Sequence, residues 1–297
     1  MKKNSMTMGI GLAVLAAVLY ALNAPLSKLL LSYMPATLMA GLLYLGAGLG
    51  MGCIALVRKW KKVEKTEERL TKAELPYTVA MILLDIAAPI CLLFGLRITA
   101  PENVALLNNF EIVATALIAL MVFREKISPR LWLGIVFVTL SCCLLTVENA
   151  EGFRFSYGSL LVLLACICWG LENNCTRKIS SKDPLQIVLL KGIFSGLGSL
   201  IIGFCVGEKI AELWSIFSVL VVGFVAYGLS IYCYVYAQRI LGAARTSAYY
   251  AVAPFIAVVF SWSMFPHKLG IIFFVALCTM AIGAWLCSDD KPLFKKK

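Results

Sequence analysis

The chain has 297 residues, of which 61% are hydrophobic and only 14% are charged. Soluble domains are about 45–50% apolar and about 25% charged, so this composition excludes an ordinary water-soluble enzyme, a disordered chain and a disulfide-stapled secreted domain. The formal charge of +11 would suit nucleic acid, but the basic residues are confined to short segments between apolar runs. That distribution indicates a membrane surface instead. We therefore expect lipid around the chain and no nucleic-acid partner.

Ten apolar runs are long enough to cross a membrane, since a helix needs about 20 residues for the hydrocarbon layer. The sequence predicts an all-α membrane protein with ten transmembrane helices. The predicted spans are 8–31, 35–57, 76–96, 101–123, 129–147, 157–177, 184–206, 213–237, 244–264 and 269–288.

The positive charges in the connections predict the orientation of the chain. If the N-terminus is cytoplasmic, 21 of the 27 Lys and Arg residues fall in cytoplasmic segments and only four in outside segments. Positive residues collect on the cytoplasmic side of membrane proteins. We expect a multi-pass protein of the cytoplasmic (cell) membrane with both termini in the cytoplasm.

The chain also carries a weak internal repeat. A shift of 149 residues aligns the first span with the sixth, and a shift of 142 aligns the later spans of the two units, with identities such as Leu22/Leu171 and Arg97/Arg239. We expect two repeats of five helices, at residues 1–150 and 151–297. Because five is odd, the second repeat enters the membrane from the opposite face, and such inverted pairs underlie alternating-access transport.

Four segments meet a known pattern. Residues 20–23 (YALN) and 169–172 (WGLE) are similar to a W-G-x-N signature, and residues 110–114 (FEIVA) and 123–128 (FREKIS) to an x-E-P segment and a G-E-x-x-[ST] loop. In these features the chain resembles the EamA family of the drug/metabolite transporter superfamily, with Ile112 where the family pattern has Pro. The resemblance implies the scaffold of a metabolite transporter and does not name the solute.

Carboxylates inside the third and fourth spans are functional candidates, because charge at bilayer depth is costly unless it faces a partner or a cavity. Asp85 lies about 14 Å along its helix from Pro76, near the middle of the membrane. Glu111 lies at a similar depth, on a predicted helical face shared with Asn108 and Thr115. Glu111 either carries a proton or contacts solute, or it is bonded to neighbouring helices and fixes their packing.

Polar residues of the sixth and first spans form a second group. The sixth span holds Glu172 and Asn173, and the first span, its partner in the repeat, holds Asn23 and Ser27. Glu172 either lines the pathway or pairs with a basic residue at the cytoplasmic end of its helix, such as Arg177 or Lys178.

Lys191 and two tyrosines leave alternatives open. Lys191 in the seventh span balances a buried carboxylate, contacts an anionic solute, or extends to the membrane surface. Tyr227 and Tyr250 either line a central cavity or belong to the interfacial belt. Small-xxx-small faces, such as the one formed by Gly192 and Gly196, predict a close helix crossing, either static or moving.

Our leading hypothesis is a secondary active transporter, an exporter or exchanger of a small organic solute, with protons as the candidate coupling ion. The expected partners are that solute and membrane lipid, and a homodimer is one candidate assembly. Candidate pathway residues are Asn23, Ser27, Asn108, Glu111, Thr115, Glu172, Asn173, Tyr227 and Tyr250, and candidate proton carriers are Glu111, Asp85 and Glu172.

Two alternatives of other classes carry less support. An intramembrane lipid-modifying enzyme would need a nucleophile–base pair or a metal cluster, and neither GxSxG nor HExxH occurs in the chain. A membrane scaffold or sensor would be expected to carry a soluble output domain. With one histidine and no CxxC pair among eleven cysteines, we expect no metal and no cofactor.

Overall fold

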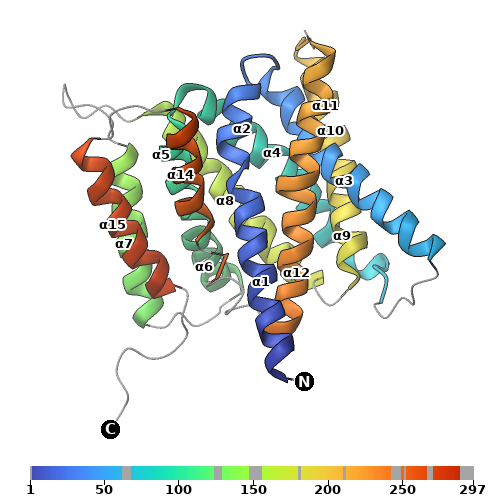
Figure 1. Ribbon diagram of the computed structural model, residues 1–297, viewed down its shortest axis with the longest axis horizontal. Helices are drawn as coiled ribbons and strands as arrows, with labels where there is room; N and C mark the ends of the chain where they lie inside the picture. The colour runs from blue at the N-terminus through green and yellow to red at the C-terminus, as the bar shows by residue number, and fades with distance from the viewer. Residues whose placement is uncertain are drawn as a thin grey trace.

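The structure is a computed structural model that describes residues 2–61, 68–123, 129–146, 156–179, 182–209, 212–241, 249–250, 252–265 and 270–287. All regular structure within these ranges is helical (Figure 1). Seven of the described helical segments are long and apolar enough to cross a membrane: Met6–Leu30, Ala36–Trp60, Lys72–Ile98, Asn103–Val122, Tyr157–Thr176, Pro184–Cys205 and Leu213–Ala237. Three shorter apolar helices lie at Trp132–Leu144, Ala253–Met264 and Ile271–Leu286. The chain is therefore an all-helical, multi-pass membrane protein.

The described residues of the first half form seven α-helices and one turn of 3-10 helix. Proline opens several of them, as expected where the missing N–H has no helical partner in any case. In chain order they are α1 (Lys2–Ala21), α2 (Asn23–Leu30), α3 (Ala36–Trp60), η1 (Lys72–Glu74), α4 (Leu75–Ile98), α5 (Pro101–Leu107), α6 (Phe110–Phe123) and α7 (Pro129–Thr146).

In the second half, the part of the chain that the structure describes contains two π-helical segments among its α-helices. In chain order the elements are α8 (Tyr157–Ile179), α9 (Pro184–Leu190), η2 (Lys191–Ser195), α10 (Gly196–Cys205), α11 (Leu213–Val222), η3 (Gly223–Leu229), α12 (Ser230–Leu241), α14 (Ala253–Met264) and α15 (Ile271–Cys287). The π-segments η2 and η3 lie inside the predicted spans 184–206 and 213–237 and shift the helical register there.

Two of the predicted spans are interrupted helices. The span predicted at 8–31 divides at Leu22, because Pro25 has no N–H to donate to the carbonyl of Ala21. The span predicted at 101–123 divides at Asn108 and Asn109, whose side chains compete with backbone hydrogen bonding.

The second interruption bears on the polar face predicted for the fourth span. Asn108 follows α5 and lies outside α6, so the predicted face of Asn108, Glu111 and Thr115 does not belong to one uninterrupted α-helix. The backbone N–H of Glu111 donates to the carbonyl of Asn108, at 3.1 Å, in a tighter turn than an α-helix makes.

Helix α3 occupies the core of the right-hand part of the bundle, packed against α9–η2–α10 on one side and α11–η3 on the other (Figure 1). Glycine makes both contacts close. A Cβ on Gly192 would lie 2.4 Å from the backbone nitrogen of Gly48, and one on Gly46 would lie 2.1 Å from the carbonyl oxygen of Leu220. The predicted small-residue faces are thus backbone-to-backbone crossings.

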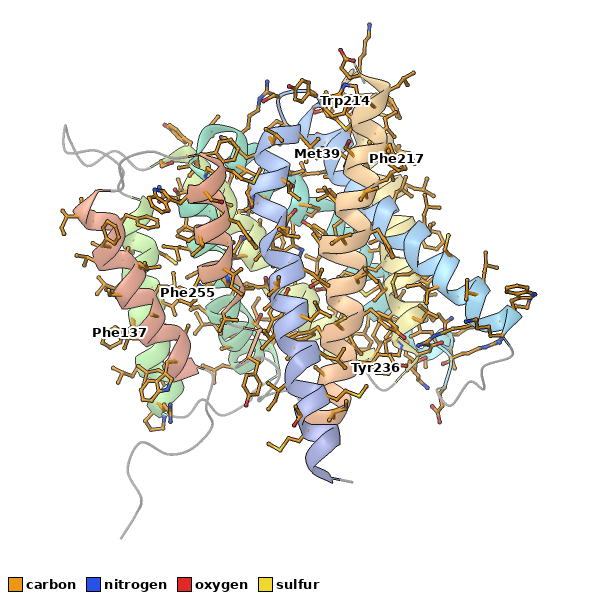
Figure 2. The ribbon with its side chains drawn as sticks, in the orientation of Figure 1. Met39, Phe137, Trp214, Phe217, Tyr236 and Phe255 are labelled. Carbon is orange, nitrogen blue, oxygen red and sulfur yellow. The ribbon has the colours of Figure 1, made fainter. Side chains whose placement is uncertain are left out.

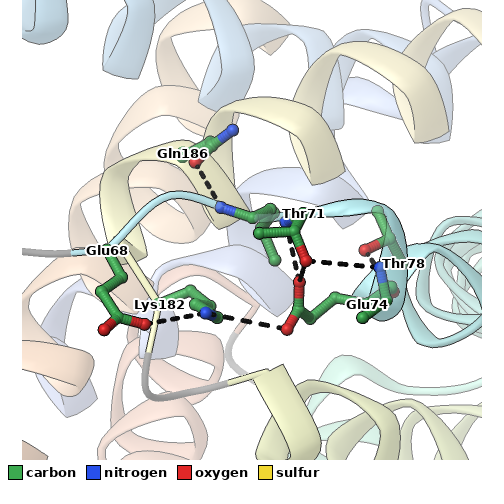
Figure 3. A network of polar contacts seen from close by, with 8 residues as sticks. Glu68, Thr71, Glu74, Thr78, Lys182 and Gln186 are labelled. Atoms are coloured by element: carbon green, nitrogen blue, oxygen red, sulfur yellow. Dashed lines mark hydrogen bonds and ion pairs between the residues drawn. The ribbon is translucent and has the colours of Figure 1, made fainter.

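Helices α3 and α9–η2–α10 form an antiparallel pair. The network in Figure 3 connects the two members at one end of this pair. Lys182, which precedes α9, lies 2.9 Å from Glu68 Oε2 and 3.7 Å from Glu74 Oε1. The backbone N–H of Leu70 donates to Gln186 Oε1 at 3.1 Å. The hydrogen bond to Glu68 raises the pKa of Lys182 above its usual value. The segment that follows α3 is therefore fastened to the start of α9.

The opposite end of the pair has a tie of the same kind. The carboxylate of Glu208, which follows α10, accepts hydrogen bonds from the backbone N–H groups of Thr37 and Leu38, at 3.3 and 2.9 Å. These N–H groups belong to the first turn of α3, where no helical partner exists. In each case the segment after one helix of the pair is fastened to the start of the other.

The outward faces of the helices are apolar. Trp214 and Phe217 of α11 project from the bundle (Figure 2) and are 50% and 72% exposed. On the far side of the bundle α7 and α15 pack against each other, joined by a hydrogen bond of 2.6 Å from Ser141 Oγ to the carbonyl of Ala276. Such surfaces suit hydrocarbon rather than water.

Candidate functional site

A charged cluster of three residues lies in the core of the bundle. Lys191 Nζ lies 3.2 Å from Asp85 Oδ2 and 3.0 Å from Glu172 Oε1, and the three side chains come from η2, α4 and α8. Asp85 is 0% exposed, Glu172 2% and Lys191 8%. Buried charges require partners, and here one ammonium serves two carboxylates. When all three groups are ionised, the cluster carries a net charge of −1.

Neutral donors surround the charged cluster. The hydroxyl of Tyr44 donates to Asp85 Oδ1 at 2.8 Å and accepts a hydrogen bond of 3.5 Å from Trp169 Nε1. Thr176 donates to Glu172 from one turn further along α8. Sequence reasoning missed Tyr44; the signal was a single hydroxyl-bearing aromatic residue within the apolar run of its helix.

Lys191 therefore balances two buried carboxylates, which was one of its three predicted roles. The alternative in which it extends to the membrane surface is wrong, because its ammonium lies between Asp85 and Glu172. Glu172 is correspondingly buried inside the bundle. Of the two basic residues predicted as partners of Glu172, Lys178 is exposed, and the side chain of Arg177 lies outside the described residues, as do residues 124–128 of the loop motif.

Glu111 contacts α8 through an amide. Asn173 Nδ2 donates to Glu111 Oε1 at 2.6 Å and lies 3.4 Å from Thr115 Oγ1, while Asn174 Nδ2 donates to the carbonyl of Thr115 at 3.1 Å. The structure thus brings three of the predicted pathway residues together. Glu111 is only partly buried, and its bond to α8 is the arrangement that a packing role predicts.

A neutral cluster lies across α3 from the charged one. Asn23 Nδ2 donates to the hydroxyl of Tyr227 at 3.3 Å, and Ser27 Oγ donates to Asn23 Oδ1 at 3.0 Å. All three side chains are buried. The bond from Ser27 to the residue four positions before it repeats the bond from Thr176 to Glu172.

Aromatic rings continue the neutral cluster. The centroid of the Tyr227 ring lies 5.1 Å from that of Tyr44 and 6.1 Å from that of Tyr20, and Tyr20 lies 5.9 Å from Tyr250. Tyr234 packs on Tyr250 at 4.9 Å. Tyr227 and Tyr250 therefore belong to one cluster of rings inside the bundle.

A small pocket opens beside these rings, between α1, α2, α5 and α14. Its cavity volume is about 10 Å³, the room that about one water molecule needs. Asn23 and Asn108 line it among the predicted pathway residues. The full lining is Tyr20, Ala21, Asn23, Ala24, Ala105, Asn108, Ala253, Pro254 and Ala257.

Comparison with known proteins places the chain among membrane transporters. The model of the EamA-like transporter family matches residues 7–147 and again residues 156–288. An uncharacterized inner membrane transporter of Escherichia coli K12, YedA, is 23% identical over 272 residues, which cover 89% of this chain and 85% of that protein.

Two further relatives match over shorter stretches. An uncharacterized transporter of Methanothermobacter thermautotrophicus is 24% identical over 201 residues, and the uncharacterized transporter YyaM of Bacillus subtilis is 20% identical over 184 residues. These matches span 64% and 57% of this chain, and 58% and 59% of the relatives. A solved crystal structure superimposes with a TM-score of 0.66 over 95% of both chains at 16% identity, which shows a shared fold.

Proposed function

Because the chain belongs to the EamA-like transporter family, we propose that it is a secondary active transporter, an exporter or exchanger. It moves a small organic solute across the cell membrane by alternating access, driven by protons. The two halves of the molecule, residues 1–150 and 151–297, form an inverted pair of five spans each, with both termini in the cytoplasm. Two matches of one family model on either side of residues 148–155 support this division.

The packing of the helices supports an inverted pair. An axis that exchanges the two halves would exchange the contact of α4 with α8 for that of α1 with α12, and both contacts are extensive. It would also exchange the contact of α6 with α8 for that of α1 with α14, and both are present. The pairs α3 with α9–α10, α5 with α14 and α7 with α15 would each map onto themselves.

The polar clusters follow the same register. Asn23 and Glu172 lie 149 residues apart, as do Ser27 and Thr176, while Asp85 lies 142 residues before Tyr227. These are the two shifts that align the repeats. Asn23, Ser27 and Tyr227 of the neutral cluster therefore occupy, in the opposite halves, the positions of Glu172, Thr176 and Asp85 in and around the charged cluster, and we assign recognition to one cluster and coupling to the other.

The charged cluster supplies the coupling in this proposal. In a low-dielectric interior an ion pair is strong and an unpaired charge is costly, so adding one proton to Asp85 or Glu172 changes which carboxylate holds Lys191. Because Asp85 lies in the first half and the other two residues in the second, such an exchange alters the contact between halves. Glu111 is the second candidate proton carrier, next to α8.

The observation that carries the proposal is the placement of these three charges at the junction of the halves, in the interior of a membrane bundle. A packing role alone would be met at lower cost by apolar residues of similar size. The neutral cluster and the pocket beside it supply the hydrogen-bonding groups for a small solute.

Transport is tested with purified protein in two steps. Thermal unfolding in the presence of individual amino acids, nucleosides and sugars identifies stabilising solutes, and a radiolabelled stabilising solute is then offered to proteoliposomes with an imposed pH gradient. We expect accumulation that collapses with the gradient and that Glu172→Gln and Glu111→Gln each lower at least tenfold. The exposed Glu212 lies outside the spans, so Glu212→Gln is the matched control.

Two results would refute this function. One is the absence of accumulation for every solute that stabilises the protein, and the other is full gradient dependence in both glutamine variants. The inverted topology has its own test, because Gly152→Cys should react with a membrane-impermeant maleimide from the side opposite the termini.

A further inference from the structure

Tyr44 of α3 contacts both polar clusters. Its hydroxyl donates to Asp85 Oδ1 at 2.8 Å, and its ring packs on the Tyr227 ring with centroids 5.1 Å apart at an interplanar angle of 60°. Tyr227 accepts the hydrogen bond from Asn23, which lines the pocket. Tyr44 is 2% exposed, so both contacts are made inside the bundle, and a continuous path of contacts runs from the pocket wall to the charged cluster.

We propose that Tyr44 is a positioning residue that couples the pocket to the charged cluster, holding Asp85 in place through its hydroxyl and responding to Tyr227 through its ring. This inference rests on the proposed function, because it assigns the connection between the solute pocket and the proton-binding groups. A solute that displaces Tyr227 moves the Tyr44 ring. This movement breaks or strengthens the hydrogen bond from the Tyr44 hydroxyl to Asp85.

The backbone around Tyr44 makes this coupling sensitive to small movements. A Cβ on Gly192 would lie 2.8 Å from the carbonyl oxygen of Tyr44, and Gly192 follows Lys191 directly. The backbone of Tyr44 therefore lies against the π-segment that carries the ammonium. Any movement of α3 and η2 together relative to α4 changes the positions of the Tyr44 hydroxyl and of Lys191 relative to Asp85.

Three elements packed around Asp85 carry charged or hydrogen-bonding groups that influence its protonation. Lys191 faces it from η2, Glu172 from α8 and Tyr44 from α3, while Lys28 of α2 donates to the carbonyls at the far end of α4, including that of Leu96 at 2.6 Å. Among these contacts, the hydroxyl of Tyr44 is the neutral donor to the carboxylate. A Tyr44→Phe variant removes that donor and keeps the ring.

Trp169 reports on the charged cluster without any solute, because it lies on α8 three residues before Glu172 and its indole N–H donates to the Tyr44 hydroxyl. The experiment records intrinsic fluorescence of purified protein between about pH 4 and pH 10, with the Trp169→Phe spectrum subtracted to isolate this residue. We expect a pH-dependent change that Asp85→Asn abolishes. Tyr44→Phe moves its midpoint to higher pH by about half a unit or more, since the carboxylate loses a hydrogen bond. Tyr77→Phe, at an exposed tyrosine of α4, leaves the midpoint unchanged.

A double-mutant cycle tests the connection to the pocket. Tyr227→Leu removes the ring that packs on Tyr44, and we expect it to shift the midpoint in the wild-type background but not in Tyr44→Phe. Equal shifts in both backgrounds, an unshifted Tyr44→Phe, or a Trp169 signal that is constant with pH would each overturn the inference. Thermal unfolding of every variant identifies shifts that merely follow loss of fold.

This experiment uses neither solute nor gradient, so its outcome is separable from that of the proposed function. If the protein shows no flux but the double-mutant cycle gives the expected result, transport is refuted and the coupling through Tyr44 stands. If the protein shows gradient-driven flux but the shifts in the pH midpoint are additive, transport stands and the role of Tyr44 is refuted.

Discussion

Lys191 Nζ lies 3.2 Å from Asp85 Oδ2 although the two residues belong to different halves of the chain, and Glu172 holds the same ammonium at 3.0 Å. The three charges are satisfied only by one another and by the donors around them. The stability of the bundle and the protonation of its core are therefore linked.

The first prediction concerns this linkage. Lys191→Met leaves two buried carboxylates without their cation, which should destabilise the protein by about 3–5 kcal/mol. The triple variant Asp85→Asn, Glu172→Gln and Lys191→Met removes all three charges and should recover most of that loss. Thermal unfolding in detergent measures both, with Lys209→Met at an exposed site as control. A triple variant no more stable than the single one would contradict the prediction.

The second prediction concerns the glycine crossing. A Cβ on Gly192 would lie 2.4 Å from the backbone nitrogen of Gly48, so Gly192→Ala should separate α3 from η2 and cost about 1–3 kcal/mol. Around Gly11 of α1 nothing lies within 4 Å of the added carbon, which makes Gly11→Ala the matched control. If the unfolding temperature falls by the same amount in both variants, the crossing of α3 and η2 can accommodate a methyl group and the prediction is wrong.

The third prediction concerns the tie in Figure 3. Lys182→Ala removes the cation that Glu68 and Glu74 share, so hydrogen exchange of the backbone around residues 68–74 should accelerate while the unfolding temperature of the whole protein changes little. Added salt should narrow the difference, because exposed charges are screened. Lys59→Ala, at the exposed end of α3, is the control.

The same tie has a predicted pH dependence. Hydrogen bonding to Glu68 raises the pKa of Lys182, so its stabilising effect is fully present below the ordinary lysine range and is lost as the pH rises through the raised value. Protection of residues 68–74 that is already lost near neutral pH would contradict the assignment.

The fourth prediction concerns the opposite end of the helix pair. Glu208 accepts hydrogen bonds from Thr37 and Leu38 at the start of α3, so Glu208→Ala should cost about 1 kcal/mol, as loss of a helix cap does. Glu208→Gln keeps an acceptor oxygen and should lose less. Identical unfolding temperatures for the alanine variant and the wild type would contradict the capping role.

The sequence predicted the helical class and the general position of the helices because lipid requires long apolar segments. It did not predict the π-segments η2 and η3, since the extra residue in each follows from packing against α3 rather than from composition. The interruption at Asn108 was missed for a related reason. A regular period of 3.6 residues was assumed through two asparagines whose side chains compete for the backbone.

The candidate site was predicted as separate residues and not as contacts. Depth along the helix identified Asp85 and Glu111, because distance from a helix-opening proline is readable in the chain. The bridge that Lys191 makes between Asp85 and Glu172 needs three helices in place, so the sequence left three roles for it. Sequence reasoning did not identify Tyr44, because its proposed role depends wholly on neighbours from other helices.

The antiparallel pair of α3 and α9–α10 meets backbone to backbone midway and is fastened at both extremities. We expect such a pair to be rigid, so that its two members tilt together and do not separate. In the proposed transport cycle, the pocket then opens by movement of the helices that wall it, α1, α2, α5 and α14, past this rigid pair.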